Sequence, residues 1–507
     1  MRTKNSIKNI ISSFVNTFIL NILRFISRMI FIKQIGELYL GVNGLLSNVL
    51  GLLSLAELGI GSAIAFSLYK PLANDDYDKI NSIMFFYKKA YRTIGLIIFF
   101  IGLVMLPLIP HLINDTTGIE NLSLIYFIFL INMVVSYFFS YKRTLVDANQ
   151  KNYTIVPITV FFSFLTTVLQ IIVMLVFKNF IIYLLIQTLT VILENIFVNI
   201  YINKQYPYLK ENNVKPLDDK ELKSIKKQIK ALFFHKIGSY AVNSTDNLII
   251  SKMIGIITVG LYSNYLLILN TINSFISTIV NNVLASFGNL IVKESSKKSE
   301  NVFKELRLFS YSMYAISTIC FINIFNPFIT IWLGKDFLLP MFVVYIISIN
   351  NYFFGINYAV ILTKTAGGLF DEDKYFPILE AVINLVASII LAKYLGLAGV
   401  FLGTFIGKIP TLINKPMIVY NKIFKKSSKE YFLNAFKQVL LLIIMLILTK
   451  GLLYIIPNIS PLIDLIINIL ISGLLPLIII ILVYKNTDEF KNLINRFKKL
   501  VLRRGIK

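Results

Sequence analysis

The chain has 507 residues, of which 56% are hydrophobic and 15% charged, and its mean hydropathy is +0.73. Soluble domains carry about 25% charged residues, so the composition excludes an ordinary soluble protein. Lys and Arg number 50 against 26 Asp and Glu, a formal net charge of +24. These basic residues fall in short groups between apolar runs of about twenty residues, whereas nucleic-acid-binding proteins gather them on one folded face. We therefore expect a membrane protein with no nucleic acid partner.

The residue types that build catalytic metal sites are scarce. Cys320 is the only cysteine, which excludes an internal disulfide and a thiolate metal site. His111 and His235 lie far apart in the sequence, and no HExxH motif or phosphate-binding GxxxxGK[ST] loop occurs. The sequence therefore predicts no metal site, no catalytic residues and no ATPase of its own.

Apolar runs follow one another along the whole chain. The first follows Arg2, Lys4 and Lys8 and lacks a small-residue cleavage site, so it predicts an uncleaved first helix rather than a signal peptide. The expected spans, about fourteen, are 9–33, 40–69, 90–112, 122–141, 154–177, 180–202, 233–254, 259–290, 307–331, 339–363, 375–393, 397–420, 432–455 and 462–484. Their lengths predict an all-α polytopic membrane protein.

The basic residues lie mainly on one side of the membrane. With the N-terminus placed in the cytoplasm, 41 of the 50 Lys and Arg residues lie in the tails, the even-numbered connections or the adjoining ends of the spans, and six lie in the odd-numbered connections or the span ends beside them. Cytoplasmic loops carry this excess of positive charge. Both termini are therefore expected in the cytoplasm.

The connection 204–232 is the longest and most charged, and we expect it to contain an amphipathic interfacial helix. It separates an N-lobe, residues 1–203 with spans one to six, from a C-lobe, residues 233–420 with spans seven to twelve. Spans thirteen and fourteen occupy residues 421–485. The tail 486–507 is basic, which favours a cytoplasmic helix on anionic lipid.

A short internal repeat supports two lobes. Lys33, Gly36 and Gly41, between spans one and two, recur 219 residues later as Lys252, Gly255 and Gly260, between spans seven and eight. The same element at the same place in each half indicates a parallel repeat. Two pseudo-symmetric six-helix lobes around a central cavity are a transporter architecture.

Polar residues form a stripe along the first span. Arg24 and Arg28 are four residues apart on one helix face, which Thr17 and Asn21 extend. A charge at bilayer depth costs at least about 2.5 kcal/mol, so this face should line the cavity. Two interpretations stay open: an anion site, since guanidinium suits phosphate oxygens, or structural pairing of the arginines with acids elsewhere.

Acidic residues also occur within the apolar runs. Glu57 in span two and Asp246 in span seven are our candidates for binding a proton or sodium ion that couples transport to a gradient. Asp246 continues a polar stripe of Ser239 and Asn243, predicted to face the cavity. Hydrogen bonding between helices is an equally good explanation for such amides.

Two pairs of segments resemble a known family. LAELGIGSAIAFSLYKPLA, from Leu55 to Ala73, and RMIFIKQIGELYLGVNGLLSNVL, from Arg28 to Leu50, resemble the first spans of bacterial polysaccharide flippases of the MOP superfamily. TDNLIIS, from Thr245, and VGLYSNY, from Val259, resemble their spans seven and eight. The likeness extends over essentially the whole chain, and by position Arg28 and Asp246 match the family best.

The resemblance implies a multi-pass protein of the bacterial plasma membrane with a MATE-like fold. Its implied activity is export of an undecaprenyl-pyrophosphate-linked oligosaccharide repeat unit for capsule or another surface polysaccharide, by rocking of two lobes. The implied partners are that lipid-linked oligosaccharide, membrane lipids and the polysaccharide polymerase and glycosyltransferases of the same process. A multidrug exporter of the same superfamily, a lipid II flippase, or a membrane polymerase or glycosyltransferase are the alternatives.

Overall fold

The computed structural model describes residues 2–57, 59–210, 245–293, 296–369 and 372–502, with positions 214, 216–219, 221–223, 225–227 and 229. Side chains are described in these ranges except at 2–17, 55–56, 210, 278–293 and 497–502. The chain divides into two compact units, Met1–Leu267 and Ile268–Lys507. The lobe boundaries expected from the sequence stay a prediction.

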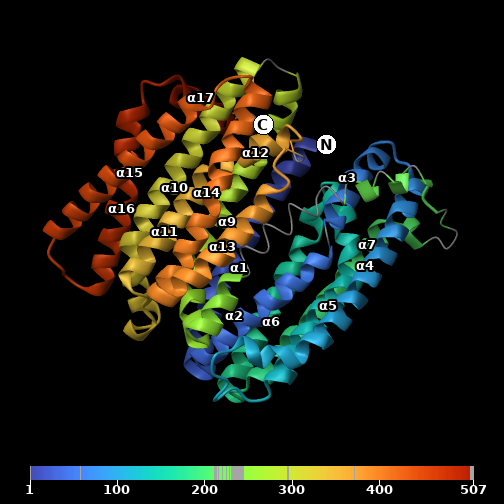
Figure 1. The fold of residues 1–507 in the computed structure, drawn as a ribbon. Coiled ribbons are helices and arrows are strands. Elements are labelled where there is room, and N and C mark those ends of the chain that lie inside the picture. Colours follow the sequence, from blue (N-terminus) through green and yellow to red (C-terminus); the bar gives the residue numbers. More distant parts are fainter. Residues whose placement is uncertain are drawn as a thin grey trace. The chain divides into compact units, whose positions relative to one another are not determined.

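All regular elements of the described residues are helices (Figure 1). In the first unit they are α1 Arg2–Ile35, α2 Glu37–Leu53, α3 Ile60–Ala73, α4 Tyr77–Met105, α5 Leu122–Ala148, α6 Val156–Val176 and α7 Phe180–Gln205, with 3-10 turns at Ser54–Glu57, Leu106–Leu112, Asn152–Thr154 and Pro207–Lys210. α9, Ile256–Lys293, begins in this unit and continues into the second. Residues 245–253 are also helical.

The second unit continues with α10 Ser296–Trp332, α11 Met341–Ile356, α12 Tyr358–Ala366, α13 Phe376–Leu395, α14 Leu397–Val419, α15 Lys429–Ile455, α16 Pro461–Tyr484 and α17 Asp488–Leu502. A 3-10 turn lies at Lys335–Phe337 and a π-helical turn at Tyr420–Phe424.

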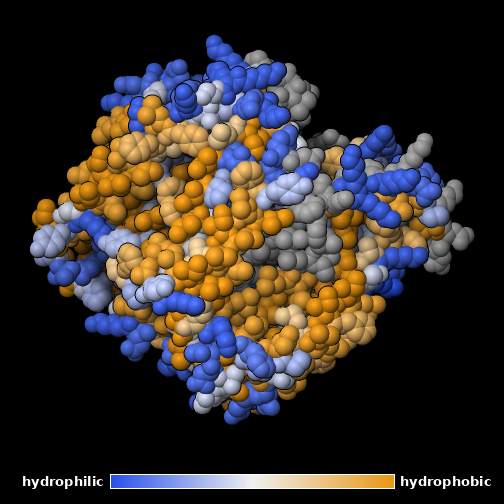
Figure 2. All heavy atoms as spheres, viewed as in Figure 1, coloured by the Kyte–Doolittle hydropathy of each residue, from blue (hydrophilic) through white to orange (hydrophobic). Residues whose placement is uncertain are grey.

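The predicted all-α membrane fold is confirmed. Eleven helices of the described residues are long and apolar enough to cross a membrane, and they correspond to predicted spans three to six and eight to fourteen. α1 corresponds to span one, and α2 with α3 to span two. Span seven falls partly outside the described residues, at 233–244, as does most of the amphipathic helix expected in 204–232. Apolar side chains cover much of the visible surface of the helices (Figure 2).

Helix ends follow local chemistry. Asn179 caps α7, its side chain accepting from the backbone amides of Ile181 and Ile182, and Asp76 caps α4 by accepting from Lys79. Pro461 begins α16, where its missing amide hydrogen costs nothing. These local signals fix the residues at which the helices begin.

Glycines allow close packing in the second unit. In α14, Gly399, Gly403 and Gly407 recur every four residues, and a Cβ added to any of them would lie within 2.8 Å of an α13 atom. Small residues at this spacing let membrane helices approach backbone to backbone. The close approach of α14 to α13 therefore requires glycine at these three positions.

Span two departs from the continuous helix expected over 40–69. It breaks at the 3-10 turn Ser54–Glu57, and Gly59 then adopts a left-handed conformation with φ of 78° before α3 begins. Glycine takes this conformation without the steric cost that a Cβ brings. The break places Glu57 between two half-helices.

Candidate functional site

The candidate site centres on Arg28 in α1. Its Nη1 donates to Ser263 Oγ at 2.7 Å and to Asn264 Oδ1 at 3.4 Å, both at the start of α9. The Ser263 hydroxyl donates its own hydrogen to the Gly260 carbonyl at 2.7 Å, so it is an acceptor toward Arg28. Arg28 forms no ion pair with a carboxylate of the described residues. Among the described residues, the half-buried guanidinium therefore has no carboxylate that compensates its positive charge.

Arg28 and its hydrogen-bond partners lie in the segments that resemble the polysaccharide flippases. Arg28 begins the first segment that resembles the flippases, and Ser263 and Asn264 lie in VGLYSNY. Asn264 is fully buried, and its Nδ2 has no hydrogen-bond partner among the residues that the structure describes. Residues 235 positions apart thus form one polar site inside the unit Met1–Leu267.

Two glycine contacts hold α2 against α9 beside this site. A Cβ on Gly41 would lie 2.0 Å from the Ile256 carbonyl oxygen, and a Cβ on Gly260 would lie 2.7 Å from the Glu37 carbonyl oxygen. Residues 37 and 256 differ by 219, the offset that relates Gly41 to Gly260. The contact is therefore reciprocal, as expected where a pseudo-twofold axis relates two repeats.

The other arginine of the stripe differs from Arg28. Arg24 is exposed and forms no hydrogen bond or ion pair with a described residue. Asn21 is buried, 7% exposed, and its Nδ2 has no hydrogen-bond partner among the described residues. The side chain of Thr17 lies outside the described residues. The structure does not bring Arg24 and Arg28 onto a common partner.

Glu57 lies in a cluster of aromatic hydroxyls. The Tyr91 hydroxyl donates to Glu57 Oε1 at 2.7 Å, and the Tyr87 and Tyr91 ring centres are 4.4 Å apart. The Tyr87 hydroxyl lies 3.0 Å from Thr144 Oγ1 on α5. A Cβ on Gly61 would lie 3.0 Å from Glu57 Oε1, so glycine leaves room for the carboxylate. No ion pair joins Glu57 to Arg24 in this described region.

The residues predicted around span seven are only partly described. Asp246 is buried, 9% exposed, and interacts electrostatically with Tyr262 at the start of α9. Ser239 and Asn243 lie outside the described residues. The coupling roles predicted for Glu57 and Asp246 stay predictions.

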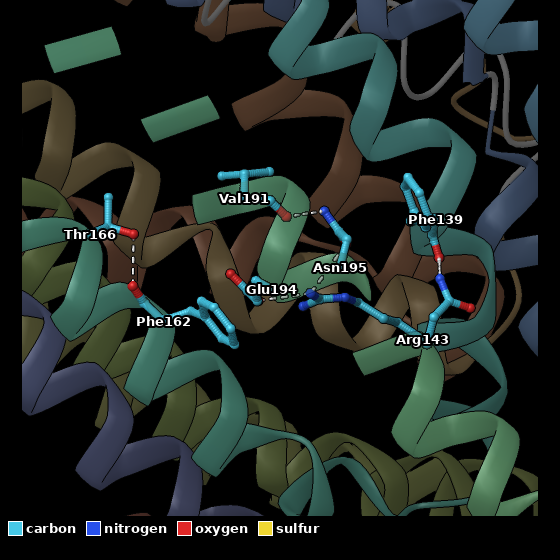
Figure 3. A network of polar contacts seen from close by, with 8 residues as sticks. Phe139, Arg143, Phe162, Thr166, Val191, Glu194 and Asn195 are labelled. Carbon is cyan, nitrogen blue, oxygen red and sulfur yellow. Dashed lines mark hydrogen bonds and ion pairs between the residues drawn. The ribbon is translucent and has the colours of Figure 1, made fainter. Parts of the chain in front are cut away.

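The sequence reasoning missed Arg143, which it placed in a connection. α5 continues to Ala148, and Arg143 Nη2 lies 2.8 Å from Glu194 Oε1 and 3.4 Å from Asn195 Oδ1, both on α7 (Figure 3). This pair, half-buried, neutralises both charges and ties α5 to α7. The sequence reasoning also did not use Tyr87 and Tyr91, whose i, i+4 spacing in α4 is the sequence signal that would have indicated the cluster around Glu57.

The chain matches the model of a protein family over residues 6–285, more than half its length: "Polysaccharide biosynthesis protein". The chain belongs to this family. The match includes Arg28, Glu57, Asp246 and Ser263. No curated protein matches the chain.

Solved structures of the MOP superfamily share the fold of this polysaccharide biosynthesis protein. The lipid II flippase MurJ, in an inward closed conformation, is similar with a TM-score of 0.67 and 17% identity, over 94% of this chain and 99% of MurJ. An inward-facing multidrug resistance MATE transporter has a TM-score of 0.63 and 14% identity, over 82% of this chain and 98% of that one. A MOP superfamily transporter from Pyrococcus furiosus has a TM-score of 0.54 and 13% identity, over 84% of this chain and 97% of that one.

Proposed function

We propose that this protein moves an undecaprenyl-pyrophosphate-linked oligosaccharide repeat unit from the inner to the outer leaflet of the bacterial plasma membrane, by alternating access. Such units supply capsule or another surface polysaccharide. The observation that carries the proposal is Arg28, a half-buried guanidinium held by neutral acceptors in the family-matched region. Its charge fits a site for an anionic substrate group.

The role of Arg28 follows from its hydrogen bonds. Both bonds to described residues use Nη1, so toward the described part of the chain Nε and Nη2 remain to donate to phosphate oxygens. A planar fork of this kind binds two oxygens of a phosphate at once. We assign the pyrophosphate to Arg28, with Arg24 as a second, more exposed cation one turn away.

Coupling to an ion gradient is a further part of the proposal. Glu57, at the break of span two, and Asp246, buried in span seven, are the carboxylates that would exchange a proton or bind sodium. Broken helices in transporters offer such sites. The alternative is uncoupled transport, driven only by the removal of the exported unit on the outer side. It requires neither carboxylate.

A multidrug exporter shares the fold, as the MATE structures show. An exporter of cationic compounds would need an acid, and Glu57, held by the neutral Tyr91 hydroxyl, is one. Arg28 would repel a cation, however, and with its neutral described partners it favours an anionic cargo. Lipid II is also a pyrophosphate-linked lipid, so a direct assay has to separate it from other repeat units.

The test uses Arg28→Ala and Arg28→Lys, with Lys33→Ala as the control that removes a positive charge from an exposed position of the same helix. Losing one charge-assisted contact costs about 1.5–3 kcal/mol, or about ten- to a hundredfold in affinity. Arg28→Ala should therefore accumulate lipid-linked repeat units on the cytoplasmic side at normal protein abundance. Arg28→Lys should be intermediate, because lysine keeps the charge and loses the fork. Normal export by Arg28→Ala would overturn the assignment.

A further inference from the structure

A second charged site lies in the unit Ile268–Lys507, away from the residues matched by the family model. A cavity of about 550 Å³ lies between α10, α15, α16 and the start of α17. Its charged lining residues are Lys304, Arg307, Lys437 and Glu489, three basic and one acidic. This size is typical of small-molecule sites, which hold about 300–1,000 Å³.

Arg307 is the buried charge of this cavity. It is 7% exposed, and its Nη2 donates to the Tyr431 carbonyl and to Gln438 Oε1, both at 3.1 Å. The guanidinium carbon also lies 4.2 Å from the centre of the Tyr431 ring. All these partners are neutral, and no described carboxylate pairs with Arg307. A buried cation without a counter-ion is costly, which points to an anion as the missing partner.

The neighbouring cations differ in their pairing. Lys304 is neutralised by Glu300 at 3.2 Å and Glu430 at 3.0 Å. Lys437 is exposed and forms no ion pair with a described residue. Arg307 and Lys437 therefore form the cationic pair available to a ligand in this cavity.

The lining changes from polar to apolar in the same direction on all three long helices. In α15 it runs from Lys437 to Ile444, about 10 Å along the axis at 1.5 Å per residue. In α10 the polar lining residues Lys304 and Arg307 precede Leu308. In α16, which runs back from α15, the apolar Val483 comes before the polar Thr487 beyond the helix end. Ile444 and Val483 are about half exposed, at 51% and 52%, on helices whose visible face is apolar (Figure 2). A ligand that fits has an anionic head and a hydrocarbon tail.

We propose that this cavity binds an anionic glycerophospholipid of the membrane leaflet on the side of the basic connections. The phosphate lies against Arg307 and Lys437, and one acyl chain lies along Leu440, Leu441 and Ile444. The site is distinct from Arg28 and does not depend on which substrate the protein transports. Bound lipid fastens α15 and α16 to α10 and to α17, which Arg496 already joins to Glu305 at 2.5 Å.

The experiment measures lipid binding to the full-length protein in phosphatidylcholine nanodiscs with increasing phosphatidylglycerol, by native mass spectrometry and by thermal unfolding. Wild type should retain phosphatidylglycerol and gain several degrees in unfolding temperature. Arg307→Gln should weaken this binding about tenfold or more. Lys437→Gln, at an exposed position that leaves the helix packing intact, should weaken it about two- to fivefold. Lys422→Gln should bind like wild type, because Lys422 is an exposed lysine of the π-helical turn Tyr420–Phe424 and does not line the cavity.

Four results would overturn the proposal. The first is equal retention of phosphatidylcholine and phosphatidylglycerol by the wild type. The second is unchanged phosphatidylglycerol binding in Lys437→Gln, which stays informative if Arg307→Gln fails to fold. The third is an equal stabilisation by glycerol phosphate, because a soluble anion would then suffice without a lipid tail. Competition by undecaprenyl phosphate at tenfold lower concentration would instead assign the cavity to a prenyl lipid and contradict a glycerophospholipid site.

Discussion

Arginine occurs in two electrostatic settings in the first unit. Arg143 lies 2.8 Å from Glu194, so the pair is neutral and joins two helices. Arg28 has, within the described part of the chain, only the Ser263 hydroxyl and the Asn264 amide oxygen as partners. The hydrogen bonds to these two partners orient the guanidinium, but neither partner carries a charge that would neutralise it. Because of this difference we assign a structural role to Arg143 and a substrate-binding role to Arg28.

The coupling proposal makes a prediction about Glu57. Glu57→Gln removes the ionisable group, and Tyr91→Phe removes the hydroxyl that donates to it at 2.7 Å. If Glu57 couples transport, Glu57→Gln should abolish the dependence of export on the proton or sodium gradient, and Tyr91→Phe should weaken it. The measurement is export at several pH values and sodium concentrations.

The matched control for the hydroxyl is Tyr126→Phe, since Tyr126 donates to the Gly102 carbonyl far from Glu57 in the sequence. It should leave gradient dependence unchanged. Asp246→Asn tests the second candidate in the same assay. Unaltered gradient dependence in both Glu57→Gln and Asp246→Asn would remove the coupling proposal.

Among the elements, the crossing of α2 with α9 has the strictest steric requirement. Added Cβ atoms on Gly41 and Gly260 would meet backbone carbonyls at 2.0 and 2.7 Å. Backbone at these distances cannot rotate away as a side chain does. Gly41→Ala and Gly260→Ala should therefore lower the unfolding temperature in detergent by several degrees, as overpacking costs about 1–3 kcal/mol.

Glycines in open surroundings provide the control. Gly451 in α15 and Gly473 in α16 have nothing within 4 Å of an added Cβ. Alanine there should be neutral or stabilising, because alanine favours a helix over glycine by about 1 kcal/mol. Equal unfolding temperatures for Gly41→Ala and Gly451→Ala would contradict the close backbone contact between α2 and α9.

Sequence patterns predicted where the helices lie in the chain better than they predicted which residues of different helices contact one another. Apolar runs of about twenty residues identified the helices because the bilayer thickness sets their length. The break at Ser54–Glu57 escaped prediction because hydropathy is the same for straight and broken helices, although Gly59 and Gly61 were visible. The pairing of Arg28 with Ser263 depends on tertiary packing between segments 235 residues apart, which no local pattern contains.

For the whole molecule, the distribution of charge predicts the orientation. With Cys320 replaced by serine, single cysteines at Asp218 and Lys298 should react with a membrane-impermeant thiol reagent only after the membrane is opened. Cysteines at Asn114 and Asn458, in odd-numbered connections, should react in intact cells. These four positions are exposed in the structure, so burial does not hide them. Labelling of Asp218→Cys in intact cells would reverse the predicted topology.

The central claim is that this protein moves a lipid-linked repeat unit across the membrane. The most direct measurement is the fraction of that lipid that an impermeant sugar-oxidising reagent reaches from outside spheroplasts, before and after depletion of the protein. Our account predicts that depletion confines the lipid to the inner leaflet, that wild type and Lys33→Ala restore its exposure, and that Arg28→Ala does not. An unchanged outer-leaflet fraction in depleted cells would contradict it.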